Sequence, residues 1–180
     1  EPQAEHSVHW LPRRGSALKA HIETRGTREL RDLPDDLLNP TQQRVKAATL
    51  SGQAFFDQPA TAQALAAHKL PGNFIDFETI QFGVPLWKGT RPYQQLPFQF
   101  SVHRLGRTGR ATHQAFLDLS GGNPSLAFAQ SLVAACGERG PVFVYNAAFE
   151  TTRIRELAER HPHLAPALRA INDRVVDLLP

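Results

Sequence analysis

The sequence predicts an α/β domain built on one mixed β-sheet, preceded by a small helical segment. Two apolar runs, Phe74–Ile80 and Val142–Tyr145, have the composition of strands near the centre of a sheet. A third segment, Leu96–Leu105, alternates apolar and polar residues, which is typical of a strand with one face in water. With the helical patterns between them, these segments predict the order β-β-β-α-β-α-β.

Residues 1–70 are predicted to form the helical segment, and residues 71–180 the sheet domain. Asn39 followed by Pro40 is the sequence of a helix N-cap and first turn, and Gly52 stands where that helix should end. Two further helices are expected: one has Ser16 as its candidate cap and ends before Gly26, and the other spans Ala60–His68. The arginines of this segment either contact a phosphate backbone or form the solvated surface of a linker: Arg13, Arg14, Arg25, Arg28, Arg31 and Arg44.

From residue 73 onward the pattern changes to strands and helices. The strands Leu96–Leu105 and Ala111–Leu117 flank the turn Arg107–Arg110, so they are expected to pair antiparallel. After the Phe74–Ile80 strand and this hairpin, the expected elements are a helix over Ser125–Arg139, the strand Val142–Tyr145, helices over Ala148–Arg160 and Leu164–Ala170, and a strand over Arg174–Leu178.

Two acids interrupt the first strand. Asp76 and Glu78 stand two positions apart, so their side chains leave the same face of the strand, roughly 7 Å apart along the backbone. Burying two carboxylates is costly unless a cation neutralises them, and hard oxygen ligands suit Mg²⁺ or Mn²⁺. The alternative is an edge strand whose polar face is in water.

A second acid-bearing segment follows the strand Val142–Tyr145. Asn146 is the expected N-cap of the next helix, and Glu150 falls in its first turn, where the helix dipole favours a carboxylate. Helix-start chemistry alone would explain Glu150. Combined with Asp-x-Glu on the first strand, however, it points to a shared site.

The two segments resemble the motifs of a known superfamily. Asp76-Phe77-Glu78-Thr79 resembles the first motif of the DEDD 3′–5′ exonucleases, which belong to the ribonuclease H-like superfamily. Tyr145-Asn146-Ala147-Ala148-Phe149-Glu150 resembles their second motif, His-Asn-x-x-Phe-Asp. Two positions depart from it, because Tyr145 replaces the histidine and Glu150 replaces the aspartate.

Three further stretches extend the resemblance. Arg174–Leu179 resembles the strand that follows the second motif in these enzymes. Gly89–His103 resembles an uncharacterised bacterial family of exonuclease-like domains that often stand behind a RecB/Cas4-like nuclease region. Gly26–Pro34 resembles the helix–hairpin segments that link nuclease domains. The resemblance implies nucleic acid, DNA or RNA, as the partner, and an upstream RecB/Cas4-like domain in the same protein.

The resemblance implies a ribonuclease H-like sheet, truncated at the C-terminus, in which the first strand is central and the fourth lies beside it. That adjacency would bring Glu150 close to Asp76 and Glu78. These three acids are the implied catalytic residues and ligands of two Mg²⁺ or Mn²⁺ ions in phosphodiester hydrolysis, and Asp177 is a further candidate ligand. The fourth acid and the general base are expected beyond Pro180.

The resemblance also suggests which residues contact the substrate: Thr79, Arg91, Tyr93, Asn146 and Phe149. Asn146 and Phe149 would orient the second motif or the terminal nucleotide. In the long loop over residues 81–92, Trp87 and Arg91, with Tyr93 just after it, have the chemistry to stack on or clamp a nucleic-acid strand. Packing of this loop against its own domain is the alternative.

Two other functions stay open. A ribonuclease H-like module whose metal site has decayed would bind nucleic acid or a partner protein without catalysis. Endonucleolytic cleavage on the same fold is a third possibility. In the parent sequence beyond Pro180, an aspartate four or five residues after a Tyr or His would favour the exonuclease.

Composition limits the remaining possibilities. A net charge of +3 over 180 residues permits contact with nucleic acid without requiring it. The single cysteine, Cys136, fits a reducing cytoplasm and a small core residue. No apolar run approaches the ~18 residues of a membrane span. The chain has no methionine, so we expect an excerpt of a longer protein. His103 and His113 lack the spacing of metal ligands and are expected at the surface or on a β face. His161 and His163 are expected in a loop between helices, and the sequence offers no partners for a zinc site there.

Overall fold

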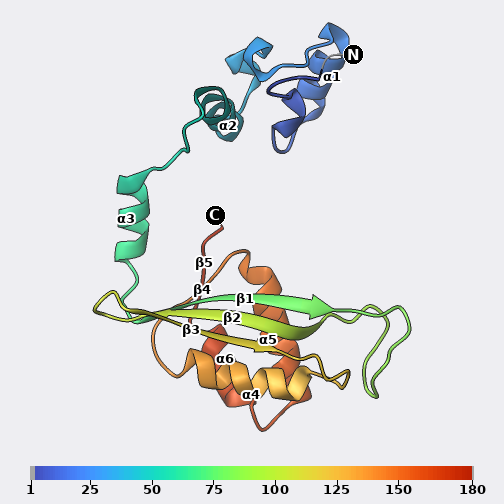
Figure 1. Cartoon of the computed structure of the whole chain (residues 1–180), viewed down its shortest axis with the longest axis vertical. Coiled ribbons are helices and arrows are strands. Elements are labelled where there is room, and N and C mark those ends of the chain that lie inside the picture. The colour runs from blue at the N-terminus through green and yellow to red at the C-terminus, as the bar shows by residue number, and fades with distance from the viewer. Residues whose placement is uncertain (1–2, 180) are drawn as a thin grey trace. The chain divides into compact units, whose positions relative to one another are not determined.

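The computed structural model describes residues 3–179, which divide into two compact units between Gln63 and Ala64 (Figure 1). The division falls inside helix α3 (Gln58–Ala66). This helix begins and ends two residues before the predicted Ala60–His68.

The first unit is helical and has its own apolar core. Helices α1 (Ser16–Arg25) and α2 (Pro40–Ser51) are joined through 3-10 turns and end at glycines with left-handed backbone angles, as predicted. Seven apolar residues are buried together: Val8, Leu11, Leu18, Ile22, Leu30, Leu33 and Leu38. These residues come from helices and turns alike, so the unit is held by burial of apolar side chains as well as by helix propensity.

Helix α2 begins with the predicted N-cap. The Asn39 Oδ1 accepts a hydrogen bond from the Gln42 N–H at 3.0 Å, and the Gln42 Oε1 accepts one from the Asn39 N–H at 3.0 Å. This reciprocal pair is a capping box, which satisfies backbone donors that the first helical turn leaves free. Gln42 is itself buried, and its Nε2 donates to the Pro12 carbonyl at 2.9 Å.

The second unit contains a five-stranded mixed sheet in the order β3-β2-β1-β4-β5. β1 is central, pairing antiparallel with β2 and parallel with β4, and β5 is parallel to β4. The α/β class and the adjacency of the first and fourth strands are therefore confirmed. The strands are β1 (Gly72–Ile80), β2 (Leu96–Leu105), β3 (Ala111–Leu117), β4 (Val142–Val144) and β5 (Val175–Asp177).

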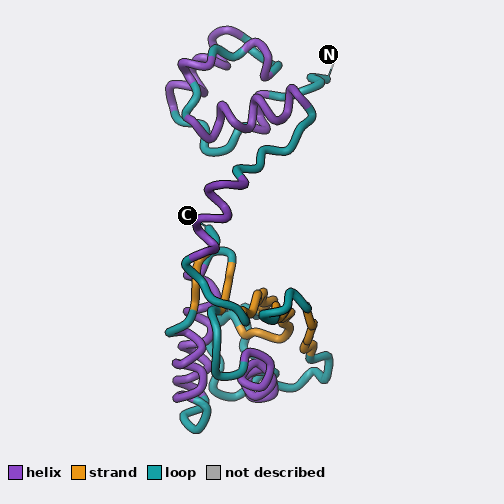
Figure 2. The backbone as a smooth tube through the Cα atoms, turned by 90° about the vertical axis from the view of Figure 1, so that its left-hand side faces the viewer, coloured by secondary structure: helices purple, strands orange, loops and turns teal. Residues whose placement is uncertain are grey.

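Three helices share one core with one face of the sheet: α4 (Ser125–Cys136), α5 (Ala147–Arg160) and α6 (Ala165–Asn172). Figure 1 shows α4 and α6 on the same side of the sheet, and Figure 2 shows the strands and helices in a second view. Inward side chains such as Ile75, Phe77 and Val144 meet apolar residues of all three helices. On the opposite face of β1 and β2, Asp76, Glu78 and His103 are exposed, so that face is open to solvent.

The predicted helix over Ser125–Arg139 is too long, because α4 ends at Cys136. Gly137 has a φ of +55°, a conformation that stops the helix and favours glycine. The buried Asn73 on β1 donates from Nδ2 to the Cys136 carbonyl at 3.1 Å, which satisfies this helix end. Cys136 is fully buried as predicted, and burial raises the pKa of its thiol to about 11.

β2 and β3 have the predicted bounds, and the remaining boundaries differ from the prediction by one or two residues. β4 ends at Val144, one residue before the predicted Tyr145, and β5 is shorter than predicted by one residue at each end. Across residues 3–179, the structure contains no helix with the length and apolarity needed to cross a bilayer.

Candidate functional site

The two acid-bearing segments meet where β4 ends and α5 begins. β4 pairs with β1 only at Asn73 and Phe74, so β1 continues past the end of its parallel neighbour. α5 starts three residues after Val144, at the same end of the sheet. Open α/β sheets usually bind ligands at the carboxyl ends of their strands, and this is such an end.

Asp76 and Glu78 lie on the open face of β1, as predicted. Both are exposed, whereas Ile75 and Phe77 on the opposite face are 5% and 4% exposed. Across the antiparallel ladder, Asp76 is opposite Ser101 and Glu78 is opposite Gln99. The ladder shifts register directly after Glu78, and the predicted substrate residue Thr79 is half-buried there.

Glu150 occupies the first turn of α5 and is only 3% exposed. Its Oε2 has no hydrogen-bond partner within residues 3–179. Burial raises the pKa of this carboxyl, its own backbone N–H lowers the pKa, and the charges of Asp76 and Asp177 raise it further. A buried, unpartnered carboxylate in the field of two other acids is costly to ionise unless a cation joins it.

The predicted N-cap role of Asn146 is wrong. Asn146 has a φ of +74°, and its side chain makes no capping hydrogen bond. The cap comes from β5, because the Asp177 Oδ1 accepts from the Asn146 N–H and its Oδ2 from the Ala147 N–H, each at 3.0 Å. The local N-cap signal fails because Asn146 has a left-handed backbone, whereas a capping side chain usually leaves an extended backbone and accepts from the second or third N–H of the helix.

Asp177 was also predicted as a metal ligand. Its carboxylate accepts a third hydrogen bond from the Leu179 N–H at 2.9 Å. The backbone N–H groups of Leu179, Ala147 and Asn146 lower its pKa, so it stays ionised. The structure thus gives Asp177 a role in fixing the start of α5, which places Glu150.

The predicted metal ligands do not form a closed cluster. Among residues 3–179, no three His, Cys, Asp or Glu side chains are arranged so that they could hold a metal ion. The carboxylate oxygens of Asp76 and Glu150 are nevertheless hard donors of the kind that Mg²⁺ and Mn²⁺ prefer, and the Glu150 Oε2 is unsatisfied. These two residues therefore fit a divalent cation in chemistry and charge.

A hollow of about 190 Å³ lies beside Asp76 on the open face of the sheet. Its polar lining comes from four residues: Asp76, Ser101, His103 and Tyr145. Tyr145 is 70% exposed, although it directly follows the buried β4. Tyr145 stands where the resembled motif has a histidine, so an exposed phenol lines the same hollow as Asp76.

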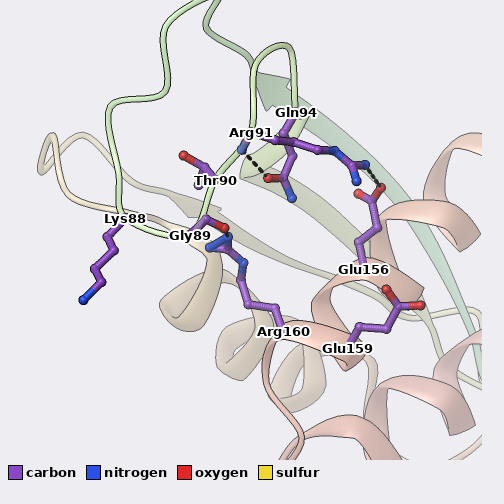
Figure 3. Close-up of a pocket in the computed structure, with 8 residues that line it drawn as sticks. All are labelled: Lys88, Gly89, Thr90, Arg91, Gln94, Glu156, Glu159 and Arg160. Carbon is purple, nitrogen blue, oxygen red and sulfur yellow. Dashed lines mark hydrogen bonds and ion pairs between the residues drawn. The ribbon is translucent and has the colours of Figure 1, made fainter.

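The loop between β1 and β2 packs against its own domain at several points. Arg91 forms an ion pair with Glu156 of α5 at 3.5 Å, and Arg160 donates to the Gly89 carbonyl (Figure 3). The Trp87 Nε1 donates to the Gly121 carbonyl at 3.1 Å. The loop was expected either to contact nucleic acid or to pack against its own domain, and for Trp87 the structure shows packing.

The two remaining predicted substrate residues, Tyr93 and Phe149, differ in their exposure to solvent. Tyr93 is 71% exposed, with a φ of +57°. Phe149 is partly buried against the core, and the Arg153 guanidinium lies 5.7 Å from the centre of its ring. Phe149 supports the first turn of α5 from within. Tyr93 remains available to a ligand.

Sequence reasoning missed the neighbours of Asp76 on the open face. His103 and His113 are exposed as expected, but their rings stack 4.3 Å apart, and the His113 Nε2 lies 2.9 Å from the Ser101 Oγ. The alternation in β2 places Ser101 and His103 on one face. The cross-strand register, which joins them to Asp76 and His113, was not predicted.

A family model matches residues 73–180, and its description is "Domain of unknown function (DUF2779)". The matched range contains the sheet except Gly72, the first residue of β1, and every residue of the candidate site. No curated protein and no solved structure matches the chain. Because the match covers more than half of the sequence, the chain belongs to the DUF2779 family.

Proposed function

We propose that this chain carries part of a metal-dependent nuclease, a 3′–5′ exonuclease on a ribonuclease H-like fold that uses two Mg²⁺ or Mn²⁺ ions. The observation that carries the proposal is the buried, unpartnered Glu150 carboxylate next to Asp76, at the junction of two adjacent parallel strands. The strand order, with β1 central and β4 beside it, supports the fold. The motif resemblance supplies the reaction and its polarity.

In this proposal each residue has a defined task. Asp76 and Glu150 hold cations, and Glu78 adds a further carboxylate from the same face of β1. Bound divalent cations would supply positive charge and activated water for hydrolysis of a phosphodiester. Asp177 fixes the start of α5, and the Asn146 side chain, which is not used as a cap, is free to contact the terminal nucleotide.

A second candidate is a ribonuclease H-like module that binds nucleic acid or a partner protein without cleaving it. Two observations favour it. The described residues lack a group of three metal-binding side chains, and Asp177 already accepts three backbone hydrogen bonds. Endonucleolytic cleavage on the same site is a third candidate, and the products of digestion distinguish it.

The deciding experiment uses the purified protein and its Asp76→Asn and Glu150→Gln variants. We expect millimolar Mn²⁺ or Mg²⁺ to raise the melting temperature of the wild type, because only the folded state assembles the acids. The same ions should support shortening of single-stranded nucleic acid from its 3′ end. Both variants should lose both responses, and Glu138→Gln, which removes an exposed acid after α4, should keep them.

The outcomes separate the candidates. If the wild type and Asp76→Asn respond identically to metal in melting and digestion, the nuclease proposal fails and the binding module replaces it. Internal cuts in a circular single strand, lost in Asp76→Asn, would assign endonuclease activity instead.

A further inference from the structure

Four rings form one row across the open face of the sheet. In the strand register, Phe143 of β4 is beside Phe74 of β1, Phe74 is opposite His103 of β2, and His103 is opposite His113 of β3. The phenylalanine rings stack with centroids 4.7 Å apart, and the histidine rings with centroids 4.3 Å apart. We call these four residues the ring row. Its phenylalanine end is half-buried or buried, and its histidine end is exposed.

The ring row lies directly beside the first acid of the site. Asp76 is two residues after Phe74 in β1, and its antiparallel partner Ser101 is two residues before His103 in β2, a shift of roughly 7 Å. The 2.9 Å contact between the His113 Nε2 and the Ser101 Oγ joins the ring row to the Asp76–Ser101 pair. Tyr145, His103 and Asp76 line the same hollow. Planar rings thus border the acid on the face where a ligand has access.

The charge around this face complements a polyanion. Residues 79–117, which run from the end of β1 through β3, contain five lysines and arginines and no aspartate or glutamate. Lys88 lies in the loop before β2, where Arg91 is paired with Glu156 of α5, and Arg107 and Arg110 lie in the turn after β2. Basic segments therefore flank both ends of β2, with the acids between them. A phosphate backbone suits such a distribution, and the bases of a nucleic acid supply planar groups that can stack on the rings.

We propose that the ring row and Tyr145 form a stacking platform for a single-stranded nucleic acid. This inference rests on the proposed function and names the form of its substrate. Unpaired bases stack on His103, His113 and Tyr145, while the backbone runs toward the basic segments and presents a phosphodiester to Asp76. Exposed rings on a sheet bind unstacked bases without reading sequence, and a duplex keeps its bases inside.

The test measures binding without cleavage. The full chain in EDTA is titrated against a labelled single-stranded oligonucleotide, as DNA and as RNA, and against a blunt duplex of the same sequence, by fluorescence anisotropy. The variants are Tyr145→Ala, Tyr145→Phe and the double variant His103→Ala/His113→Ala. His163→Ala is the matched control, because His163 is an exposed histidine in the segment between α5 and α6. Thermal unfolding checks that every variant folds.

We expect Tyr145→Ala and the double histidine variant each to weaken single-strand binding about tenfold, the range that loss of a stacked base produces. Tyr145→Phe keeps the ring and should bind as the wild type does, as should His163→Ala. The duplex should bind more weakly than the single strand.

Three results would overturn the platform: unchanged affinity in the ring variants, equal weakening by Tyr145→Phe, or no binding of any oligonucleotide at low salt. The last would assign the face to a protein partner. Metal-dependent digestion decides the proposed function separately. Ring-dependent binding with no digestion supports the platform and rejects the nuclease. Digestion that depends on Asp76 but not on the rings supports the nuclease and rejects the platform.

Discussion

Two helices of this chain follow an asparagine, and their starts are built in different ways. At α2, Asn39 has a φ of −72° and caps the helix within a four-residue capping box. At α5, Asn146 has a φ of +74° and does not cap, and the carboxylate of Asp177 replaces it from 31 residues further along the chain. The first start is encoded locally, and the second exists only in the assembled sheet.

The difference shows how the site gains its polar groups. In a local cap, as at α2, the asparagine side chain accepts a backbone hydrogen bond and is not available to a ligand. At α5 the strand β5 supplies the cap, so the Asn146 side chain is not used and the first turn still presents Glu150 toward β1. The same residue type in the same position therefore serves stability in one unit and is available for function in the other.

Asp177→Ala should produce the largest loss of stability. It removes the acceptor of three backbone hydrogen bonds and leaves the start of α5 without a cap. Trp87 fluorescence in a Trp10→Phe background would report the unfolding of the second unit alone, since each unit contains one of the two tryptophans. Asp173→Ala, at a nearby exposed acid, is the control. Equal effects of the two changes would contradict the long-range cap.

The two acids of the α5 start should respond to pH in opposite directions. The pKa of Asp177 is lowered by backbone N–H groups, so its stabilisation is present above its ordinary pKa and is lost as pH falls through the lowered value. The pKa of Glu150 is raised by burial, so its protonated form favours the fold, and that contribution is lost as pH rises through the raised value.

Replacing Glu150 with Gln should therefore stabilise the metal-free second unit at pH 7. The gain should be on the order of 1–3 kcal/mol, because the neutral amide removes a buried charge, and it should vanish below about pH 4, where the Glu150 carboxyl is protonated. Urea unfolding at both pH values would measure it. A destabilised Glu150→Gln at pH 7 would mean that the Glu150 carboxylate already has a partner and needs no cation.

Asn39→Ala tests the local half of the comparison. Loss of the capping box should cost the first unit about 1 kcal/mol, because the alanine leaves a backbone donor of α2 unsatisfied. Trp10 fluorescence in a Trp87→Phe background would detect the shift. The stability of the second unit should not change. A shift in both transitions would show that the units unfold together.

Asn146→Gly should have the smallest effect on stability, less than about 0.5 kcal/mol, because glycine adopts a φ of +74° freely and no side-chain cap is lost. Chemical denaturation of wild type and variant would compare them. A large loss would show that the Asn146 side chain supports the fold. Digestion by the same variant should fall, which would sharpen the contrast with Asn39.

Much of the sheet could be predicted because its signals are local. The alternation in Leu96–Leu105 and the apolar run before Tyr145 each identify a strand by themselves. The adjacency of β1 and β4 came from the motif resemblance, and the pairing of Asn73 with Val142 bears it out. The end of α4 was predicted three residues too late, at Arg139, because the positive φ of Gly137 stops the helix after Cys136.

The site was less predictable because its geometry depends on long-range partners. The spacing of Asp76 and Glu78 is fixed by the strand, and their shared face was predicted correctly. The cap from Asp177 depends on where β5 docks, which no local pattern encodes. The ring row needs the registers of three strand pairs at once, and one residue of slip would move His103 to the other face.

The long-range cap also sets a time at which the site can appear during synthesis. Chains fold from the N-terminus as they leave the ribosome. A nascent chain that has emerged only as far as α6 has Asp76 and Glu150 but lacks the carboxylate that fixes the first turn of α5. The acids therefore gain their final positions only after β5 has joined the sheet. A ribosome-bound fragment carries the motifs before it carries a formed site.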